Sequence, residues 1–197
     1  MTKKNKIVEK NDLIDLTTYK KNRSQLRKNL IQFKKKRRVS LGPYATFYFE
    51  NFETMLAQIQ EMLHIEKGGD EQLQDELNAY NPLIPKGKEL IATLMFEIDD
   101  PILRADFLGK VGGIEEKIYM QVAGGKIKAV SENDVDRTSA EGKASSVQFI
   151  HFNFSAEQIK KFKELNTEVV IFINHNLYNH MTKISKDTKI ALAKDFI

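Results

Sequence analysis

The run "TEVVIFIN" at residues 167–174 is the feature that most constrains how this chain can fold. A strand with one face in water alternates apolar and polar side chains, but every residue from Val169 to Ile173 is apolar. This pattern is typical of a central strand that is covered on both faces. The rest of the chain must therefore supply neighbouring strands and further layers of structure.

The clearest helical pattern lies at residues 51–66, which we predict to form a helix packed on the core. Its apolar side chains recur at helical spacing and form one stripe: Phe52, Met55, Leu56, Ile59, Met62 and Leu63. Glu61 and His64 point away from the centre of this stripe, so we expect both on the solvent side. Glu61-x-x-His64 resembles half of a di-iron motif, but that orientation and the lack of a second copy argue against such a site.

Further strands and helices complete the predicted fold. Strands are expected in residues 45–50, 89–98, 117–123, 126–130 and 145–154, with a hairpin about Gly124-Gly125. Helices are expected after Asp100, where the helix carries Leu103 and Phe107, after Ser155, which forms a capping box with Gln158, and after Ser185. The chain is therefore predicted to be an α+β protein.

The segment at residues 155–166 limits how the strands on either side of it can pair. A helical link of this length covers about 18 Å, whereas a parallel return would have to span about 30 Å. We therefore predict one mixed, mainly antiparallel sheet of five or six strands, with helices packed on it. The 197 residues suit a single domain.

The charge is divided unevenly along the chain. Residues 1–38 carry 14 Lys and Arg against 3 Asp and Glu, a net charge of +11, and residues 39–197 carry 17 and 24, a net charge of −7. We predict two amphipathic helices in the basic segment, a short one capped by Asn11 or Asp12 and a second from Asn22 that carries Leu26, Leu30 and Phe33.

The basic segment has two interpretations. It could be a nucleic-acid arm, or it could be helices appended to the acidic body of the same domain. We favour the second, because it explains the charge of both halves. The run "KKKRR" (Lys34–Arg38) contains no aromatic residue that could stack on bases, so we interpret it as a solvated face.

The composition of the chain excludes several kinds of functional site. The chain has no cysteine, which excludes disulfides, thiolate metal sites and cysteine nucleophiles, and it shows no recognisable cofactor motif. We therefore predict no cofactor and assign no metal ligands. It also shows no apolar run long enough for a membrane span and no secretory signal, so we expect a cytoplasmic protein without a membrane partner.

Two polar stretches are candidates for a binding site. His175 and His180 follow the apolar strand, and they could share a metal only if the intervening "NLYN" folds as a turn. The alternative is a plain loop whose side chains bond its own backbone. The segment "DVDRTSAEGKASS" at residues 134–146 places Arg137, Glu141 and Lys143 beside small residues, which could bind an anion, or it is a solvated strand connection. These two stretches could cooperate only if the sheet brings them to a common rim. His151 is interpreted as a partly buried sheet histidine.

Several long motifs resemble a bacterial family catalogued as domain of unknown function 3501. They are "GPYATFYFENFETMLAQIQEML", "IEKGGDEQLQDELNAYNPLIPKGKELIATLMFEIDDP" and "RTSAEGKASSVQFIHF", and the resemblance covers nearly the whole chain. It implies no established activity or catalytic residues. It does imply a redox or peroxide-stress setting, with a protein partner in a redox system.

The leading hypothesis is an accessory protein that binds an anionic ligand or a protein partner through Arg137, Glu141, Lys143, His175 and His180. A second hypothesis is a metal-dependent, hydrolase-like enzyme that uses His175 and His180 with a carboxylate. A third is nucleic-acid binding through the basic residues 1–38, which we consider the weakest.

Overall fold

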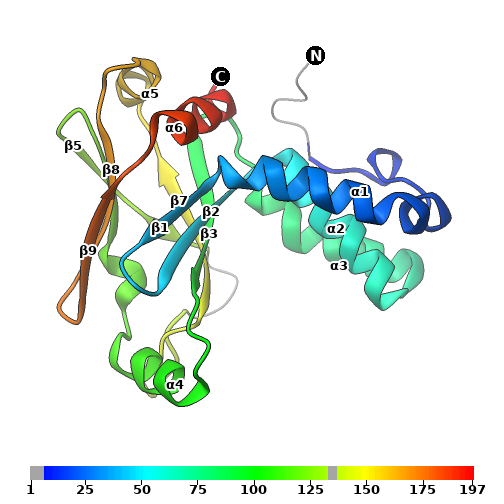
Figure 1. The fold of residues 1–197 in the computed structure, drawn as a ribbon, viewed down its shortest axis with the longest axis horizontal. Coiled ribbons are helices and arrows are strands. Elements are labelled where there is room, and N and C mark those ends of the chain that lie inside the picture. Colours follow the sequence, from blue (N-terminus) through cyan, green and yellow to red (C-terminus); the bar gives the residue numbers. More distant parts are fainter. Residues whose placement is uncertain (1–6, 133–136) are drawn as a thin grey trace.

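Two antiparallel sheets form the centre of the molecule (Figure 1). The computed structural model describes residues 7–132 and 137–197, and in these residues the sheets have the strand orders β1-β2-β3-β7-β6 and β5-β4-β8-β9. The strands of the first sheet are β1 (Arg38–Leu41), β2 (Ala45–Glu50), β3 (Glu89–Phe96), β6 (Val130–Ser131) and β7 (Val147–Asn153). Those of the second are β4 (Ile118–Val122), β5 (Gly125–Lys128), β8 (Val169–His175) and β9 (Tyr178–Lys183).

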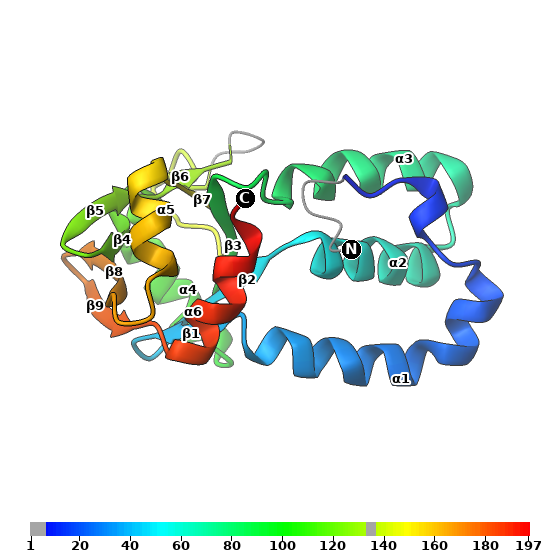
Figure 2. The ribbon, with the colours of Figure 1, turned by 90° about the horizontal axis from the view of Figure 1, so that it is seen from above.

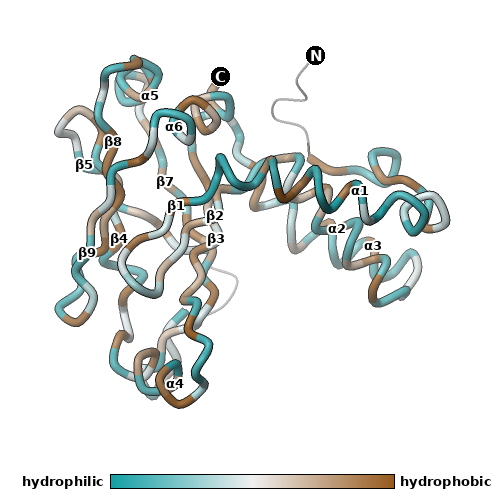
Figure 3. The backbone as a smooth tube through the Cα atoms, viewed as in Figure 1, coloured by the Kyte–Doolittle hydropathy of each residue, from teal (hydrophilic) through white to brown (hydrophobic). Residues whose placement is uncertain are grey.

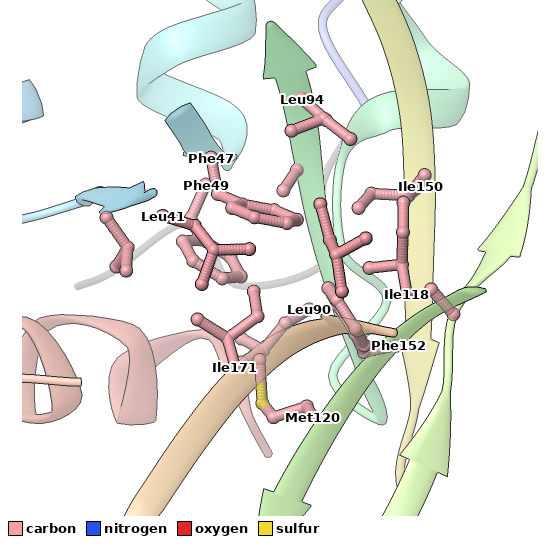
Figure 4. Packing of buried hydrophobic residues seen from close by; sticks show 14 of the residues in the cluster. Leu41, Phe47, Phe49, Leu90, Leu94, Ile118, Met120, Ile150, Phe152 and Ile171 are labelled. Atoms are coloured by element: carbon pink, nitrogen blue, oxygen red, sulfur yellow. The ribbon is translucent and has the colours of Figure 1, made fainter. Parts of the chain in front are cut away.

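The sheets bury one apolar core between them (Figure 4). Phe47, Leu90 and Ile150 of the first sheet meet Met120 and Ile171 of the second, and all five side chains are fully buried. Burial alternates along β7, as expected where one face of a sheet packs on a core. The core therefore depends on side chains from both sheets.

Strand β8 is central in its sheet, between β4 and β9, as its apolar sequence predicts. Its inner residues Ile171 and Ile173 are fully buried, whereas Val170 and Phe172 on the outer face are only partly buried. Phe172 stacks on Tyr119 of β4, with the ring centroids 5.2 Å apart. The outer face of β8 is thus covered by side chains of the neighbouring strand. The apolar sequence of β8 does not by itself show whether such side chains or a further layer of helices covers that face.

Three long helices stand to one side of the sheets (Figures 1 and 2). They are α1 (Leu16–Lys35), α2 (Phe52–Glu66) and α3 (Gly69–Tyr80). Together with η1 (Lys10–Asp12) and η2 (Asn81–Leu83) we call them the helical lobe. A separate apolar cluster lies here, centred on Ile59 of α2 and joined to the first sheet through Ile91. Most of α1 is hydrophilic (Figure 3).

The helix prediction for residues 51–66 is confirmed, and that for the basic segment needs correction. Asn51 caps α2 by accepting a hydrogen bond from the Thr54 N–H at 3.1 Å. The short helix expected after Asn11 or Asp12 is instead the 3-10 helix η1, which ends at Asp12. The helix expected from Asn22 begins earlier, at Leu16, because Asp15 provides the cap by accepting from the Thr18 N–H at 2.9 Å. Arg37, in the run interpreted as a solvated face, is only 3% exposed.

The solvent-side placement of Glu61 and His64 is also wrong, because α1 covers that face of α2. Glu61 accepts a hydrogen bond from the Tyr19 hydroxyl at 2.6 Å and pairs with Arg23. The His64 ring meets the Tyr19 ring edge-on at 5.5 Å. Both side chains therefore attach α2 to α1.

Short helices close the two ends of the sheets (Figure 1). Helix α4 (Pro101–Lys110) and η3 (Ile114–Lys117) lie at one end, and α5 (Ala156–Lys163), α6 (Lys186–Leu192) and η4 (Ala193–Asp195) lie at the other. The predicted caps Asp100, Ser155 and Ser185 are confirmed by hydrogen bonds from backbone N–H groups of the first turns.

The α+β class and the antiparallel pairing are confirmed, but the strands divide between two sheets rather than one. The link at residues 155–166 explains the difference, since α5 carries the chain from β7 in the first sheet to β8 in the second. The turn after β4 uses Ala123 and Gly124, both with positive φ, one residue before the predicted pair. Strand β9 was not predicted. Among the described residues, no helix is both long and apolar enough to cross a membrane.

Candidate anion-binding site

The polar segment singled out in the sequence forms a tight hairpin in its described part, residues 137–146, while residues 134–136 lie outside the described residues. The Ser139 N–H donates to the Lys143 carbonyl, and the Gly142 N–H donates to the Ser139 carbonyl, both at 2.8 Å. A further bond runs from the Ser145 N–H to the Arg137 carbonyl at 2.7 Å. The backbone here is held by its own hydrogen bonds.

This hairpin is fixed against the end of α4 and the turn that follows it. The Ala144 N–H donates to the Leu108 carbonyl at 2.9 Å, and the Gly113 N–H donates to the Thr138 hydroxyl at 2.9 Å. A Cβ on Gly112 would lie only 2.2 Å from the Gly142 carbonyl oxygen, so this approach requires glycine. The hairpin is therefore held both by the end of α4 and by the turn at Gly112 and Gly113.

A cavity of about 420 Å³ lies between α4 and this hairpin, and we call it the α4 cavity. Its lining residues are Arg104, Leu108, Arg137, Ser139, Lys143, Ala144, Ser145 and Ser146. They include three cations and three hydroxyl groups, and no carboxylate is among them in the part of the chain that the structure describes. Such a lining attracts anions, because the positive charges act together.

Two of the three cations are held in place by protein contacts. The Arg104 guanidinium donates to the Ile98 carbonyl at 2.8 Å. Arg137 is 8% exposed, and its guanidinium carbon lies 5.1 Å from the centre of the Phe149 ring. Because these contacts already orient the guanidinium groups, an anion would order few side chains on binding.

The structure brings together some of the predicted site residues and separates others. Arg137 and Lys143 line the α4 cavity, whereas Glu141 lies at the exposed tip of the hairpin. A hydrogen bond from the Ser139 side chain lowers the pKa of the Glu141 carboxyl. Its negative charge therefore stays outside the cavity.

Arg104 was not predicted from the sequence. The sequence singled out Leu103 and Phe107 as apolar residues of this helix, but Leu103 is 44% exposed, whereas Leu108 is 5% exposed. Arg104 precedes Leu108 by one helical turn and shares its face. The four-residue spacing between Arg104 and the apolar Leu108 was the sequence signal that could have placed Arg104 on the same face of α4 as the cavity.

His175 and His180 lie on the β8–β9 hairpin. The register pairs His175 with Tyr178 and His180 with Ile173, so both imidazoles project from one face of the sheet. On a single strand they would lie on opposite faces, and the turn between them reverses this. His175 Nδ1 accepts a hydrogen bond from the Leu177 N–H at 3.2 Å, the kind of contact expected of a loop that bonds its own backbone.

His180 packs into the corner where the two sheets meet. Its ring lies edge-on to the Tyr178 ring, with the centroids 4.5 Å apart. A Cβ on Gly42 would lie 2.6 Å from the imidazole, and Gly42 has a φ of +63°, so glycine is required for two reasons. The imidazole thus fills space beside the β1–β2 turn.

The turn between β8 and β9 lies at the same end of the molecule as α4 (Figure 1), and α4 supplies Arg104 and Leu108 to the lining of the α4 cavity. Phe107 of α4 contacts the Tyr178 ring at 5.5 Å, while Arg104 and Leu108 on an adjacent face of the helix line the cavity. No histidine is among the lining residues in the part of the chain that the structure describes. The two polar stretches therefore lie on either side of α4, and the condition that they share one rim is not met by the lining of this cavity.

His151 lies apart from both places, on β7. Its ring nitrogens lie 3.1 Å from a Glu89 oxygen and 3.0 Å from a Glu132 oxygen. Burial opposes its protonation, but the two carboxylates outweigh burial and raise the pKa of His151. Within residues 7–132 and 137–197, no three His, Asp or Glu side chains are placed to hold a metal ion together.

Fold and site together define an α+β protein of two packed antiparallel sheets, with a helical lobe on one side and a cationic cavity at one end. The chain belongs to the family described as "Protein of unknown function (DUF3501)", whose profile matches residues 7–196. The resemblance inferred from the sequence motifs is thereby confirmed.

A solved structure supports the same assignment. The chain is similar to a novel protein of unknown function from Burkholderia pseudomallei K96243, known from a crystal structure, with 33% sequence identity and a TM-score of 0.91. The alignment covers 98% of this chain and 100% of that one. Comparison with curated proteins gives no match.

Proposed function

We propose that this protein is an accessory binding protein that captures an anionic ligand in the α4 cavity. One observation carries the proposal: Arg104, Arg137 and Lys143, from two separate segments, line the same cavity, and within residues 7–132 and 137–197 no carboxylate lines it with them. The volume of about 420 Å³ falls in the range of sites that hold small molecules.

The polar part of the lining defines the class of ligand. Guanidinium groups bind carboxylate and phosphate oxygens through paired hydrogen bonds, and the neighbouring Ser146 hydroxyl can donate a single one, whereas the Ser145 hydroxyl already donates to the Val147 carbonyl at 2.7 Å. Leu108 and Ala144 are the only apolar lining residues among those described. A compact, multiply charged anion therefore fits better than an apolar molecule.

This proposal includes the redox or peroxide-stress setting that the family resemblance implies. In that setting the ligand is an anionic metabolite or the acidic group of a redox partner, and the protein contributes binding rather than electron transfer. The absence of cysteine from the sequence supports an accessory role.

The test is calorimetric titration with inorganic phosphate and, separately, with malonate. We expect saturable binding of at least one of them at one site, and a Kd raised at least tenfold by Arg104→Gln or Lys143→Gln. Lys117→Gln is the matched control, because Lys117 is exposed at the same end but does not line the cavity. If neither anion binds, or if Lys117→Gln weakens binding as much as Arg104→Gln, the proposal is wrong.

A further inference from the structure

A second cationic cavity lies at the opposite end of the sheets, between α5 and α6 (Figure 1). We call it the α5–α6 cavity, and its volume is about 650 Å³. The aromatic rings of Phe162 and Phe196 lie at its floor, are fully buried, and meet edge-on with centroids 5.3 Å apart. Both rings also contact Phe154, so the floor is part of the packed core.

The walls of this cavity are held together by a buried lysine. The Lys189 ammonium of α6 donates hydrogen bonds to the carbonyls of Glu164, Leu165 and Thr167, which follow α5. These bonds satisfy all three ammonium hydrogens and join the end of α5 to α6. The cavity is therefore formed before any ligand arrives.

The rim carries positive charge that the described residues do not neutralise. Lys163, Lys186 and Lys194 line the cavity and are exposed. None of the three makes an ion pair within residues 7–132 and 137–197, and no Asp or Glu lines the cavity. Three ammonium groups around one opening attract an anionic group.

Apolar side chains lie between these lysines. Leu165 is 72% exposed and Ile190 is 49% exposed, and both line the cavity above its aromatic floor. Large apolar side chains with this much exposure gain free energy when a ligand covers them. The lining thus combines an apolar body with a cationic rim, whereas the α4 cavity combines cations with hydroxyls.

We infer that the α5–α6 cavity binds a free anionic amphiphile, an aliphatic chain that ends in a carboxylate. The chain would lie over Phe162 and Phe196 between Leu165 and Ile190, and the carboxylate would meet the lysines of the rim. The choice rests on charge complementarity at the rim and on the apolar floor beneath it. This site is independent of the α4 cavity, since the two share no lining residue among those that the structure describes.

The experiment is calorimetric titration with sodium decanoate below the concentration at which it forms micelles. Acetate supplies the carboxylate alone, and octyl glucoside supplies an uncharged chain. We expect decanoate to bind at one site at least tenfold more tightly than either. Equal affinity for acetate and decanoate would show that the apolar lining contributes nothing, and would overturn the proposal.

Variants then locate the site. The triple variant Lys163→Gln, Lys186→Gln and Lys194→Gln is expected to weaken decanoate binding at least tenfold, with Lys189 left intact to preserve the walls. Its matched control changes Lys20, Lys21 and Lys28 on α1, which are also exposed, to Gln. Ile190→Gln is expected to weaken binding severalfold, and Ile31→Gln, at 56% exposure on α1, is its control. Equal loss in a variant and its control would reject the site.

Two further measurements test which cavity holds decanoate and whether the natural ligand is a free molecule or a membrane surface. Arg104→Gln should leave decanoate binding unchanged, and a loss there would place the ligand in the α4 cavity instead. Vesicles of phosphatidylcholine with phosphatidylglycerol present the membrane surface. If the protein binds these vesicles through the same lysines but not monomeric decanoate, the inference of a free amphiphile is wrong.

Discussion

The core between the sheets and the core of the helical lobe are packed to different degrees. Between the sheets, side chains such as Phe47 and Ile171 are fully buried by partners from both layers. In the lobe, α1 contributes only Tyr19 as a buried side chain, and Leu26 and Phe33 remain 38% and 39% exposed along a groove of about 480 Å³ against α2. Less apolar burial means less stabilisation, so the lobe should open before the sheets do.

The junction between the two regions depends on a buried ion pair. Arg37 follows α1 and pairs with Asp195 near the C-terminus, and the two side chains are 3% and 7% exposed. The same guanidinium donates to the carbonyls of Phe49 and Glu50 on β2. Arg37 thus attaches α1 to the sheets and to the last turn of the chain.

The largest effect is expected in the core between the sheets. Phe47→Ala removes a fully buried ring and should lower the free energy of global unfolding by about 3–5 kcal/mol. Phe33→Ala is the matched change in the lobe, and because Phe33 is partly exposed it should cost below about 1 kcal/mol. Chemical denaturation measures both. Equal losses would contradict the comparison.

At the junction, Arg37→Ala should destabilise the protein by about 3–5 kcal/mol, because it leaves the Asp195 carboxylate buried beside fewer donors. The double variant Arg37→Ala with Asp195→Ala removes that buried charge. Its loss should therefore be clearly smaller than the sum of the two single losses, as a double-mutant cycle would show. Additive losses would mean that the pair is not coupled.

In the lobe, Ile59→Ala should cost about 2–5 kcal/mol, since Ile59 is fully buried between the lobe helices. Ile59→Ala should differ from Phe47→Ala in which region of the molecule loses protection. By hydrogen exchange, amides of α2 and α3 should lose protection while those of β3 and β7 keep theirs. Loss of protection in both regions to the same degree would show that they unfold as one unit.

Local sequence signals predicted the elements better than their assembly. The structure confirms the apolar stripe of α2, the start of that helix at Asn51, and the caps Asp100 and Ser155. Each of these features is encoded within a few residues. The partner of each face is not encoded locally. Glu61 and His64 were predicted to face solvent because no residue near them in the sequence indicates that α1 packs over them.

The same limit applies to the candidate site. Arg137 and Lys143 stand six residues apart, so a polar segment pointed to both, and the hairpin places them on one cavity. Arg104 reaches that cavity from another element, and its role depends on the docking of Gly142 against Gly112. The pairing of His175 with Tyr178 required recognition of β9, whose alternation of Tyr178, His180 and Thr182 is weakly apolar.

Acid should affect the lobe through Glu61. The guanidinium of Arg23 is the main cause that lowers the pKa of Glu61 to about 2, against an ordinary value of 4.5. Its stabilising effect is therefore complete above pH 4.5 and is lost as the pH falls toward 2. Glu61→Gln should cost about 1–2 kcal/mol near pH 7, after allowance for partial solvent screening, and almost nothing near pH 2. Unfolding measured across this range would contradict the assignment if the cost did not change.

Alkali should affect the sheets through His151, and this effect should be the smallest. Glu89 and Glu132 raise the pKa of His151, so the folded protein holds this proton more tightly than the unfolded chain does. The resulting stabilisation is present below the ordinary value of 6.5 and is lost as the pH rises through the raised pKa. His151→Gln should therefore cost more at pH 5.5 than at pH 9, with a difference below about 1 kcal/mol. The stabilisation from Glu61 is lost in acid, and that from His151 is lost in alkali. Denaturation of Glu61→Gln and His151→Gln at pH 3, 5.5 and 9 should therefore give different profiles of stability against pH. Parallel profiles would contradict the separate assignment of the two effects to the lobe and to the sheets.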